Sequence, residues 1–464
     1  MNNRQNDLQA SIEDSLARHH VAGASIAVIH GSELITAAAG VTNVTTGVEI
    51  TPETVMHIGS ITKVFNATLV MQLVDEGTVD LDERVLRYLP DLKLKDREAL
   101  EQITVKMLLN HTSGIDGEWL PDYGHDEETI EKGIARFAQL GQLFRPGAEF
   151  SYCNVATVIA GFLVQRLRGK SWHRLVRKRI FEPLQMQHAA TLPEEALLHR
   201  ASVGHHFSPT QNKLIRSSFA FGPLSFAPAG STLMMCTRDL IKFAMAHVAQ
   251  GMGANGARIL SARSAKAMQQ MTVSNKGKGY THMDMGIGWM VADDGLLHHS
   301  GGGPGVGSVL YAYPERESAA AILTNSDNCL SLIIELMEPW LKEVGNRKPL
   351  GMLDDVRLPL KQVKIDSNKY VGVYEDVFIR YRVSPTPDGL ALSRQAKWAN
   401  YDSTSTEATP PARLIPLGDD KFLLESDGKD DELPAAFRIF AFRNPDAEGH
   451  MQHLGNGHLY PRVL

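Results

Sequence analysis

The chain has 464 residues, more than one ordinary hydrophobic core organises, and we therefore expect two domains. Hydrophobic residues make up 43% of the chain and charged residues 22%, proportions that are typical of a soluble globular protein. The formal net charge of −6 gives no reason to expect nucleic acid as a partner.

The N-terminal segment predicts an amphipathic helix, with Leu8, Ile12 and Leu16 on one side. It lacks the apolar core and the small-residue cleavage site of a secretory signal. No later segment approaches the roughly 18 uninterrupted apolar residues of a membrane span. We therefore expect a cytoplasmic protein without a membrane partner, unless the chain has already lost a leader. A reducing compartment is also favoured by three widely scattered cysteines, Cys153, Cys236 and Cys329.

Apolar runs at 24–29 and 33–40 around a tight polar turn predict a β-hairpin. A helix is predicted from Ser60 to a stop at Gly77, and mostly helical and loop sequence follows to about residue 290. A second hairpin and a last helix are then predicted at 308–325 and 329–344. Strands at both ends with helices between them indicate one antiparallel sheet, flanked by helices, with a helical subdomain inserted.

The C-terminal part has a different pattern. Residues 346–365 are rich in Pro, Lys and Asp and are interpreted as a linker. Residues 366–464 offer short alternating runs separated by turn residues, which predicts a small β-barrel or sandwich of about eight strands. The fold class expected is therefore α+β and multi-domain, with residues 1–345 as the first domain.

Ser60 and Lys63 are the first candidates for chemistry. A Ser and a Lys three residues apart on a helix share a face, so the amine can reach the hydroxyl. Ser60 also lies at the helix start, where backbone N–H groups favour a developing negative charge. The pattern alone is weak, because it occurs again from Ser426 to Lys429, where Asp-Gly marks a turn and no function is expected.

Tyr152, Cys153 and Asn154 form the second candidate, the single Tyr-x-Asn of the chain. A phenol can shuttle a proton, and a side-chain amide can bind a carbonyl or amide of a substrate. The alternative is a partly buried tyrosine followed by a capping asparagine. Cys153 is expected to point away from the site.

The third candidate is the segment His299-Ser300-Gly301-Gly302, just before the second hairpin. Small residues let a substrate backbone lie along a strand edge, and a free N–H there can complete an oxyanion hole. The alternative is a glycine-rich turn with an incidental histidine.

Together, in this order and at these intervals, the three motifs resemble the serine β-lactamase and penicillin-binding-protein superfamily. Stretches such as VKMLLNHTSGI and HHSGGGPGVGSVLYAYPE are similar to its class C β-lactamase, D-aminopeptidase and esterase branch. The resemblance implies that Ser60 forms the acyl-enzyme, that Lys63 activates it and that Tyr152 passes protons. It also implies that Asn154 holds the acyl side of the substrate, and it implies no metal or cofactor.

The same resemblance places the oxyanion between the N–H groups of Ser60 and Gly302, with Ser300 and Gly301 beside the substrate. His299 takes the position at which most β-lactamases and cell-wall peptidases carry Lys, and the resemblance implies a catalytic role for it. A histidine is mostly neutral at pH 7, so free-carboxylate substrates are disfavoured there. We therefore expect a serine hydrolase that cleaves an ester or amide, on a small peptide or D-amino-acid-containing substrate.

The C-terminal region resembles the lipocalin-like barrel appended to some members of this branch, with KYVGVYE as the suggestive piece. That architecture is similar to penicillin-binding-protein-type thioesterases, which cyclise a nonribosomal peptide and would require a peptidyl carrier protein as partner. Sequence does not decide between water and amine as acceptor. A third hypothesis is a non-catalytic receptor of the same fold. The oligomeric state stays open.

Overall fold

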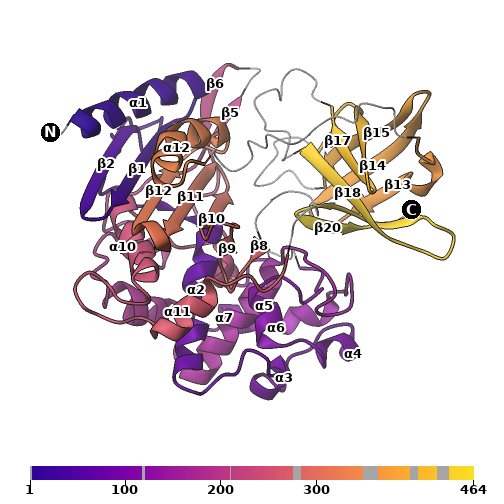
Figure 1. Ribbon diagram of the computed structural model, residues 1–464, viewed down its shortest axis with the longest axis horizontal. Helices are drawn as coiled ribbons and strands as arrows, with labels where there is room; N and C mark the ends of the chain where they lie inside the picture. The colour runs from indigo at the N-terminus through magenta and orange to yellow at the C-terminus, as the bar shows by residue number, and fades with distance from the viewer. Residues whose placement is uncertain are drawn as a thin grey trace.

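The computed structural model describes residues 3–117, 121–208, 211–274, 284–347, 364–397, 406–425 and 438–463. Its N-terminal part combines a seven-stranded antiparallel sheet with a helical region, and its C-terminal part is an eight-stranded barrel (Figure 1). The predicted α+β fold class, with a barrel after the first domain, is confirmed. Most of the expected linker 346–365 lies outside the described residues, and the domain boundaries at 345 and 366 stay predictions.

The large sheet joins strands from both ends of the N-terminal part in the order β2-β1-β12-β11-β10-β9-β8. The pair that joins the two ends of this part, β1 and β12, runs antiparallel from Ala24 opposite Thr324 to His30 opposite Ser318. The strands are β1 (Gly23–His30), β2 (Glu33–Gly40), β8 (Asp284–Met285), β9 (Met290–Val291), β10 (Leu297–Gly303), β11 (Val306–Tyr313) and β12 (Ser318–Thr324). Both predicted hairpins and the sheet made from the two ends are therefore present.

Helices cover both faces of this sheet. Side chains alternate along β12, so Ala320 and Ile322 pack on one side while Ala321 and Leu323 pack on the other. The first face is covered by α1 (Asn3–His19) and α12 (Leu330–Gly345), and the second by α10 (Thr237–Val248) (Figure 1). The predicted N-terminal helix thus buries Ile12 and Leu16 against the sheet.

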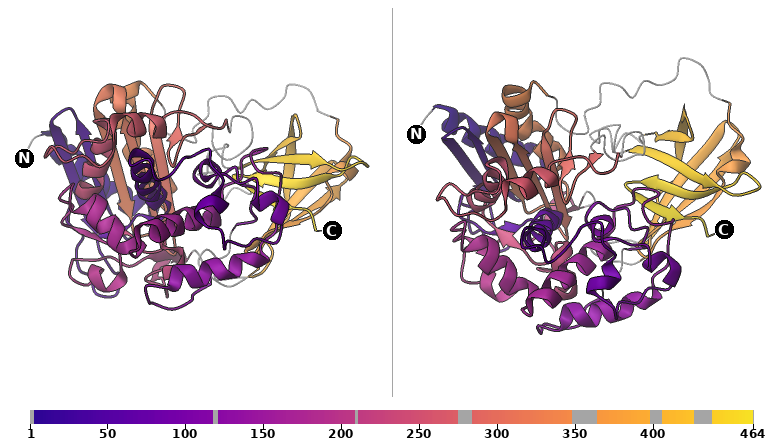
Figure 2. Two further views of the ribbon diagram at one scale, coloured as in Figure 1. Left: turned by 90° about the horizontal axis from the view of Figure 1, so that it is seen from below. Right: turned by 60° about the horizontal axis from the view of Figure 1, so that its bottom comes forward.

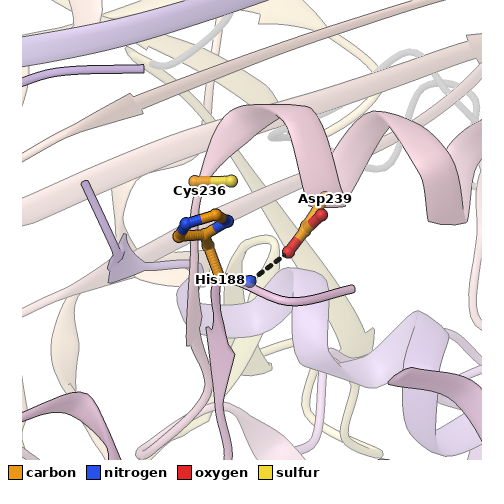
Figure 3. Close-up of side chains that lie close together, drawn as sticks. All are labelled: His188, Cys236 and Asp239. Atoms are coloured by element: carbon orange, nitrogen blue, oxygen red, sulfur yellow. Dashed lines mark hydrogen bonds between the residues drawn. The ribbon is translucent and has the colours of Figure 1, made fainter. Parts of the chain in front are cut away.

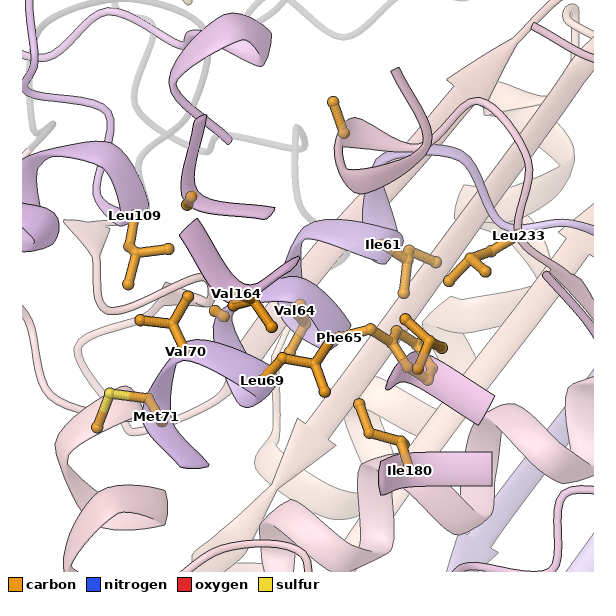
Figure 4. Packing of buried hydrophobic residues seen from close by; sticks show 14 of the residues in the cluster. Ile61, Val64, Phe65, Leu69, Val70, Met71, Leu109, Val164, Ile180 and Leu233 are labelled. Carbon is orange, nitrogen blue, oxygen red and sulfur yellow. The ribbon is translucent and has the colours of Figure 1, made fainter. Parts of the chain in front are cut away.

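The helical region surrounds α2 (Thr62–Asp75), which is buried from Thr62 to Leu73. A helix that is apolar on nearly every side needs neighbours all round. Figure 4 shows Val64, Phe65 and Leu69 of α2 packed among side chains from several other helices. The principal neighbour is α7 (Asn154–Arg168). This packing fixes the start of α2, where Ser60 lies.

Shorter elements complete the N-terminal part. The remaining α-helices are α3 (Val85–Tyr88), α4 (Arg97–Leu100), α5 (Val105–Leu109), α6 (Thr129–Arg136), α8 (Trp172–Val176), α9 (Pro193–Ala196) and α11 (Ala262–Met268). Two small sheets consist of β3 (Met56–His57), β4 (Ala189–Ala190) and β7 (Met234–Met235), and of β5 (His205–Ser208) and β6 (Lys213–Arg216). Within the described ranges, no helix has the length and apolar character that crossing a membrane requires.

The barrel consists of eight strands paired in chain order. They are β13 (Gly372–Glu375), β14 (Ile379–Thr386), β15 (Gly389–Ala396), β16 (Ala412–Gly418), β17 (Lys421–Leu424), β18 (Ile439–Pro445), β19 (Met451–Asn456) and β20 (His458–Pro461). A bridge between Tyr374 and Arg462 nearly closes the first strand onto the last. Aromatic and aliphatic side chains such as Tyr374, Phe422 and Phe442 fill the interior.

The barrel packs against the segment that precedes α7, on the side of the molecule away from α1 (Figure 2). Arg443 pairs with Glu149 at 3.2 Å, and both side chains are largely buried. The backbone N–H of Leu459 donates to the hydroxyl of Ser151 over 3.1 Å. The barrel is therefore attached beside the Tyr-x-Asn segment.

Candidate active site

Ser60 lies in the single 3₁₀ turn, Gly59–Ile61, that leads into α2. Lys63 follows one turn later, and its Nζ donates to the Ser60 Oγ over 3.1 Å and to the carbonyl of Ala229 over 2.7 Å. The Lys63 side chain is buried, with the residue only 3% exposed. The i, i+3 spacing thus places an amine directly on the hydroxyl, as the sequence predicts.

The start of α2 lies in direct backbone contact with strand β10. Gly59 has a φ of +50°, and a Cβ there would lie 2.6 Å from the backbone nitrogen of Gly302. Residues other than glycine rarely adopt this positive φ, and no side chain fits in this space. The contact brings Ser60 and Gly302 together, and both line the same cavity.

Tyr152 lies above the Ser60–Lys63 pair. The Lys63 Nζ lies 4.8 Å from the centroid of the Tyr152 ring. One face of that ring stacks on His111, with centroids 4.4 Å apart, and His458 of the barrel meets it edge-on at 5.3 Å. Three neighbours therefore hold the phenol close to the amine.

Asn154 begins α7 and lines the cavity beside Tyr152. Cys153, between them, is 1% exposed and serves as the N-cap of this helix. Its Sγ accepts a hydrogen bond from the backbone N–H of Ala156 over 3.3 Å. As the sequence interpretation expects, the thiol points into the protein and away from the cavity.

His299 lies on β10 but is not among the residues that line the cavity. It is 1% exposed, and burial, followed by the charge of Lys63, lowers its pKa to about 3. Its Nδ1–H donates to the carbonyl of Ser300 over 2.7 Å, and its buried Nε2 has no partner among the described residues. Of the predicted segment 299–302, Gly302 reaches the cavity, whereas Ser300 and Gly301 do not line it.

The cavity in front of Ser60 has a volume of about 500 Å³, within the usual range for small-molecule sites. Apolar groups form one wall, including Phe221, Pro223, Phe226 and Val306. The barrel forms another, with Phe378, Ile379, Arg394, Ala396 and His458. The sequence interpretation missed these barrel residues, because no local signal says where the barrel sits.

The aromatic and Met residues that the sequence offers as a pocket lining are Trp119, Tyr123, Phe219, Phe221, Met234 and Met235. Tyr123 does not line the cavity. Phe221 lines the cavity, while Met234 and Met235 are core residues on β7. Phe219 is 43% exposed and is not a lining residue. Trp119 lies outside the described residues.

Two further histidines lie in the site region. His57 lines the cavity and hydrogen-bonds the carbonyl of Ala220 over 3.0 Å, and burial lowers its pKa to about 4. Burial, then the charge of Lys63, lowers the pKa of His111 well below its ordinary value. Both rings are therefore neutral near pH 7.

His188, Cys236 and Asp239 form a cluster with metal-ligand chemistry away from this cavity (Figure 3). Asp239 already accepts from the backbone N–H of His188 over 2.6 Å and from Lys242 over 2.7 Å. Burial raises the pKa of the Cys236 thiol to about 12, which opposes the thiolate form that binds metals. These contacts tie the start of α10 to the preceding chain, and we assign the cluster a structural role.

A buried Ser–Lys pair at a helix start, with a tyrosine over the amine and a strand edge opposite, defines a serine hydrolase. The family model described as Beta-lactamase matches residues 8–329, and the chain belongs to that family. The predicted resemblance is thus confirmed. A curated relative is 36% identical over 366 residues, covering 77% of this chain and 94% of its own length. It is Penicillin-binding protein 4 of Amycolatopsis lactamdurans.

Solved structures extend the similarity to the barrel. The crystal structure of SurE matches with a TM-score of 0.74 at 25% identity, over 99% of both chains. A second SurE structure, with D-Leu, matches with a TM-score of 0.72 at 25% identity over 99% of both chains. D-amino acid amidase from Ochrobactrum anthropi SV3, complexed with D-phenylalanine, matches at 26% identity and a TM-score of 0.61. That match covers 73% of this chain and 99% of the amidase.

Proposed function

We propose that this protein cleaves an ester or amide bond of a small D-amino-acid-containing substrate through an acyl-Ser60 intermediate. The observation that carries the proposal is the 3.1 Å contact between the Lys63 amine and the Ser60 hydroxyl, beside the cavity that Ser60 lines. The D-residue preference is supported by the amidase and by the SurE structure with D-Leu, both similar to this chain.

In the proposed reaction, the Lys63 amine acts in its deprotonated form and takes the proton of Ser60 as the Ser60 oxygen attacks the substrate carbonyl. The new C–O bond pushes the carbonyl electrons onto oxygen, where the N–H groups of Ser60 and Gly302 stabilise the charge. Tyr152 then delivers a proton to the leaving amine or alcohol as the old bond breaks. Asn154 holds the acyl side through its amide.

The second half of the reaction removes the acyl group and regenerates the Ser60 hydroxyl. Tyr152, left as a phenolate, takes a proton from the acceptor as it attacks the acyl-Ser60 carbonyl, and the protonated Lys63 amine returns its proton to the departing Ser60 oxygen. Water as acceptor gives hydrolysis. No metal or cofactor has a role in this scheme.

A second candidate function uses an amine of the same peptide as acceptor, as in penicillin-binding-protein-type thioesterases that cyclise a nonribosomal peptide. The observation that favours it is the barrel wall of the cavity, which reduces the access of water to the acyl group. A peptidyl carrier protein would deliver the peptide. The non-catalytic receptor is the weaker hypothesis, because a buried Lys–Ser contact is costly to keep without chemistry.

The test incubates the protein with p-nitrophenyl esters, matched D- and L-amino-acid amides, D-containing peptidyl thioesters, nitrocefin and a fluorophosphonate probe. Intact mass follows covalent adducts, and chromatography separates linear from cyclic products. We expect an adduct on Ser60 that Ser60→Ala abolishes and Ser231→Ala keeps. Ser231 lines the same cavity but donates its hydroxyl to the carbonyl of Pro223 over 2.6 Å.

Lys63→Ala and Lys63→Arg should each lower kcat/KM by about 10³-fold, because neither side chain can accept a proton from Ser60. Lys106→Ala, on an exposed ion pair with Asp82, serves as the control and should keep turnover. Near-normal turnover in both Lys63 variants would overturn the proposed mechanism. Folded protein without any Ser60 adduct would favour the receptor.

A further inference from the structure

Strands β14 and β15 of the barrel turn one face toward the active-site cavity. Ile379 pairs with Ala396, and Tyr381 pairs with Arg394, in the antiparallel ladder. Because directly paired residues share a face, these side chains project on the same side of the barrel wall. Ile379, Arg394 and Ala396 all line the cavity that contains Ser60. The barrel mouth is therefore part of the pocket.

Arg394 is the one permanently charged side chain among the described residues that line this cavity. No acidic residue is among them, and His57, whose pKa burial lowers, is neutral near pH 7. Burial also lowers the pKa of His458, against an opposing effect of Asp376. The lining thus presents a single cation in a largely apolar pocket.

The guanidinium of Arg394 has a neighbouring hydroxyl but no carboxylate partner among the described residues. Its charge acts on the hydroxyl of Tyr381, its partner across the strands. Tyr381 is 7% exposed and is itself packed edge-on against Tyr460, with centroids 4.9 Å apart. Within the described part of the chain, no carboxylate forms an ion pair with Arg394, so donors remain for a ligand.

The part of the site that strand β10 forms lacks such a cation. His299 of β10 is buried, neutral near pH 7 and away from the cavity. A carboxylate entering this pocket would find no charge on β10. Arg394, reaching in from the barrel, is the group with the geometry and charge to pair with it, through two parallel N–H donors.

We propose that Arg394 is a substrate-binding residue that selects peptides or acyl groups with a free carboxylate. The inference rests on the acyl-Ser60 function and narrows its substrate class to anionic, largely apolar molecules. It also gives the barrel a specific role, since the barrel supplies the anion-binding group that the catalytic sheet lacks.

The experiment compares a D-phenylalanyl peptide that ends in a free carboxylate with the same peptide capped as its N-methylamide. For each peptide, kcat/KM is measured, together with protection of Ser60 from the fluorophosphonate probe. Arg394→Met should lower both values about tenfold to a hundredfold for the carboxylate peptide and leave the capped peptide unchanged. Arg394→Lys should restore part of the preference, because a lysine keeps the charge but loses the paired donors.

Arg382→Met is the matched control. Arg382 lies next to Tyr381 on β14, so its side chain points to the opposite, exposed face. This variant should keep the wild-type preference. Ser60 labelling by the probe at the wild-type rate shows that each variant retains its folded site.

An equal preference for the two peptides in wild type and Arg394→Met overturns the Arg394 inference and leaves the acyl-Ser60 function intact. Failure of Ser60 to label in the wild type overturns the proposed function instead. In that case calorimetric binding of the two peptides still decides the role of Arg394, and equal affinities in wild type and Arg394→Met refute it.

Discussion

The backbone N–H of Tyr152 donates to the carbonyl of Gly457 over 3.1 Å, so the tyrosine of the active site is bonded to the barrel. Ser151 accepts from Leu459 on the other side of the same turn. Between them, the ring of His458 lies edge-on to Tyr152. The turn between β19 and β20 therefore positions Tyr152, the residue proposed to transfer protons, which lies more than 300 positions earlier in the chain.

Removing the His458 ring should disturb catalysis without removing a reacting group. His458→Ala leaves Tyr152 without its edge-on neighbour, and small displacements of a catalytic group are costly. We expect kcat to fall about tenfold with KM nearly unchanged, and His458→Phe to recover most of the loss. Steady-state kinetics and the rate of Ser60 labelling measure this. His450→Ala, in the turn before β19, is the control, and an unchanged kcat in His458→Ala would contradict a positioning role.

The backbone contact at Gly59 can be tested with a matched control at Gly47, another glycine with a positive φ. Gly59→Ala would place a Cβ 2.6 Å from the nitrogen of Gly302 at a φ of +50°. Gly47 has a φ of +68°, but a Cβ there meets nothing within 4 Å. Both substitutions strain the backbone by about 1 kcal/mol, whereas only the first separates the two oxyanion donors.

Turnover should therefore fall roughly a hundredfold in Gly59→Ala, the loss typical of one oxyanion donor, and stay close to normal in Gly47→Ala. Thermal unfolding of both variants separates the loss of stability from the loss of activity. Equal turnover in the two variants would show that the contact with β10 is unimportant for the reaction.

Sequence predicts the parts of this site that depend on local geometry. Ser60 and Lys63 meet because three residues on a helix nearly complete a turn, whatever surrounds them. The strand pairs of the sheet follow from paired apolar runs around polar turns, and the barrel follows from short alternating runs. The barrel wall of the cavity is different, because the approach of Arg394 and His458 to Ser60 depends on tertiary packing alone.

His299 also shows what a sequence motif cannot predict. The motif places it beside Gly302, and the sequence interpretation gives it a catalytic role. Whether a strand residue reaches a cavity depends on the register of β10 with β11 and on the packing behind it, neither of which a motif contains. In the structure Gly302 lines the cavity, and His299 is enclosed next to Lys63.

The buried histidines predict how stability depends on pH. His299 has a pKa of about 3 in the folded protein and an ordinary value near 6.5 when unfolded. Between these values the unfolded state binds a proton that the folded state does not, so stability rises with pH across this window. The contribution is complete above about pH 6.5 and is lost as pH falls toward 3. His298, with a pKa also near 3, acts in the same direction.

Replacing His299 with Asn removes a side chain that binds a proton in the unfolded state but not in the folded state. The free energy of unfolding should then depend on pH less steeply, by up to about 1.4 kcal/mol per pH unit between pH 6 and pH 4. Denaturant titrations at several pH values measure the slope. Parallel slopes for wild type and His299→Asn would mean that His299 is protonated, or reached by water, in the folded protein. Either result would remove the argument that a carboxylate must find its positive partner on the barrel.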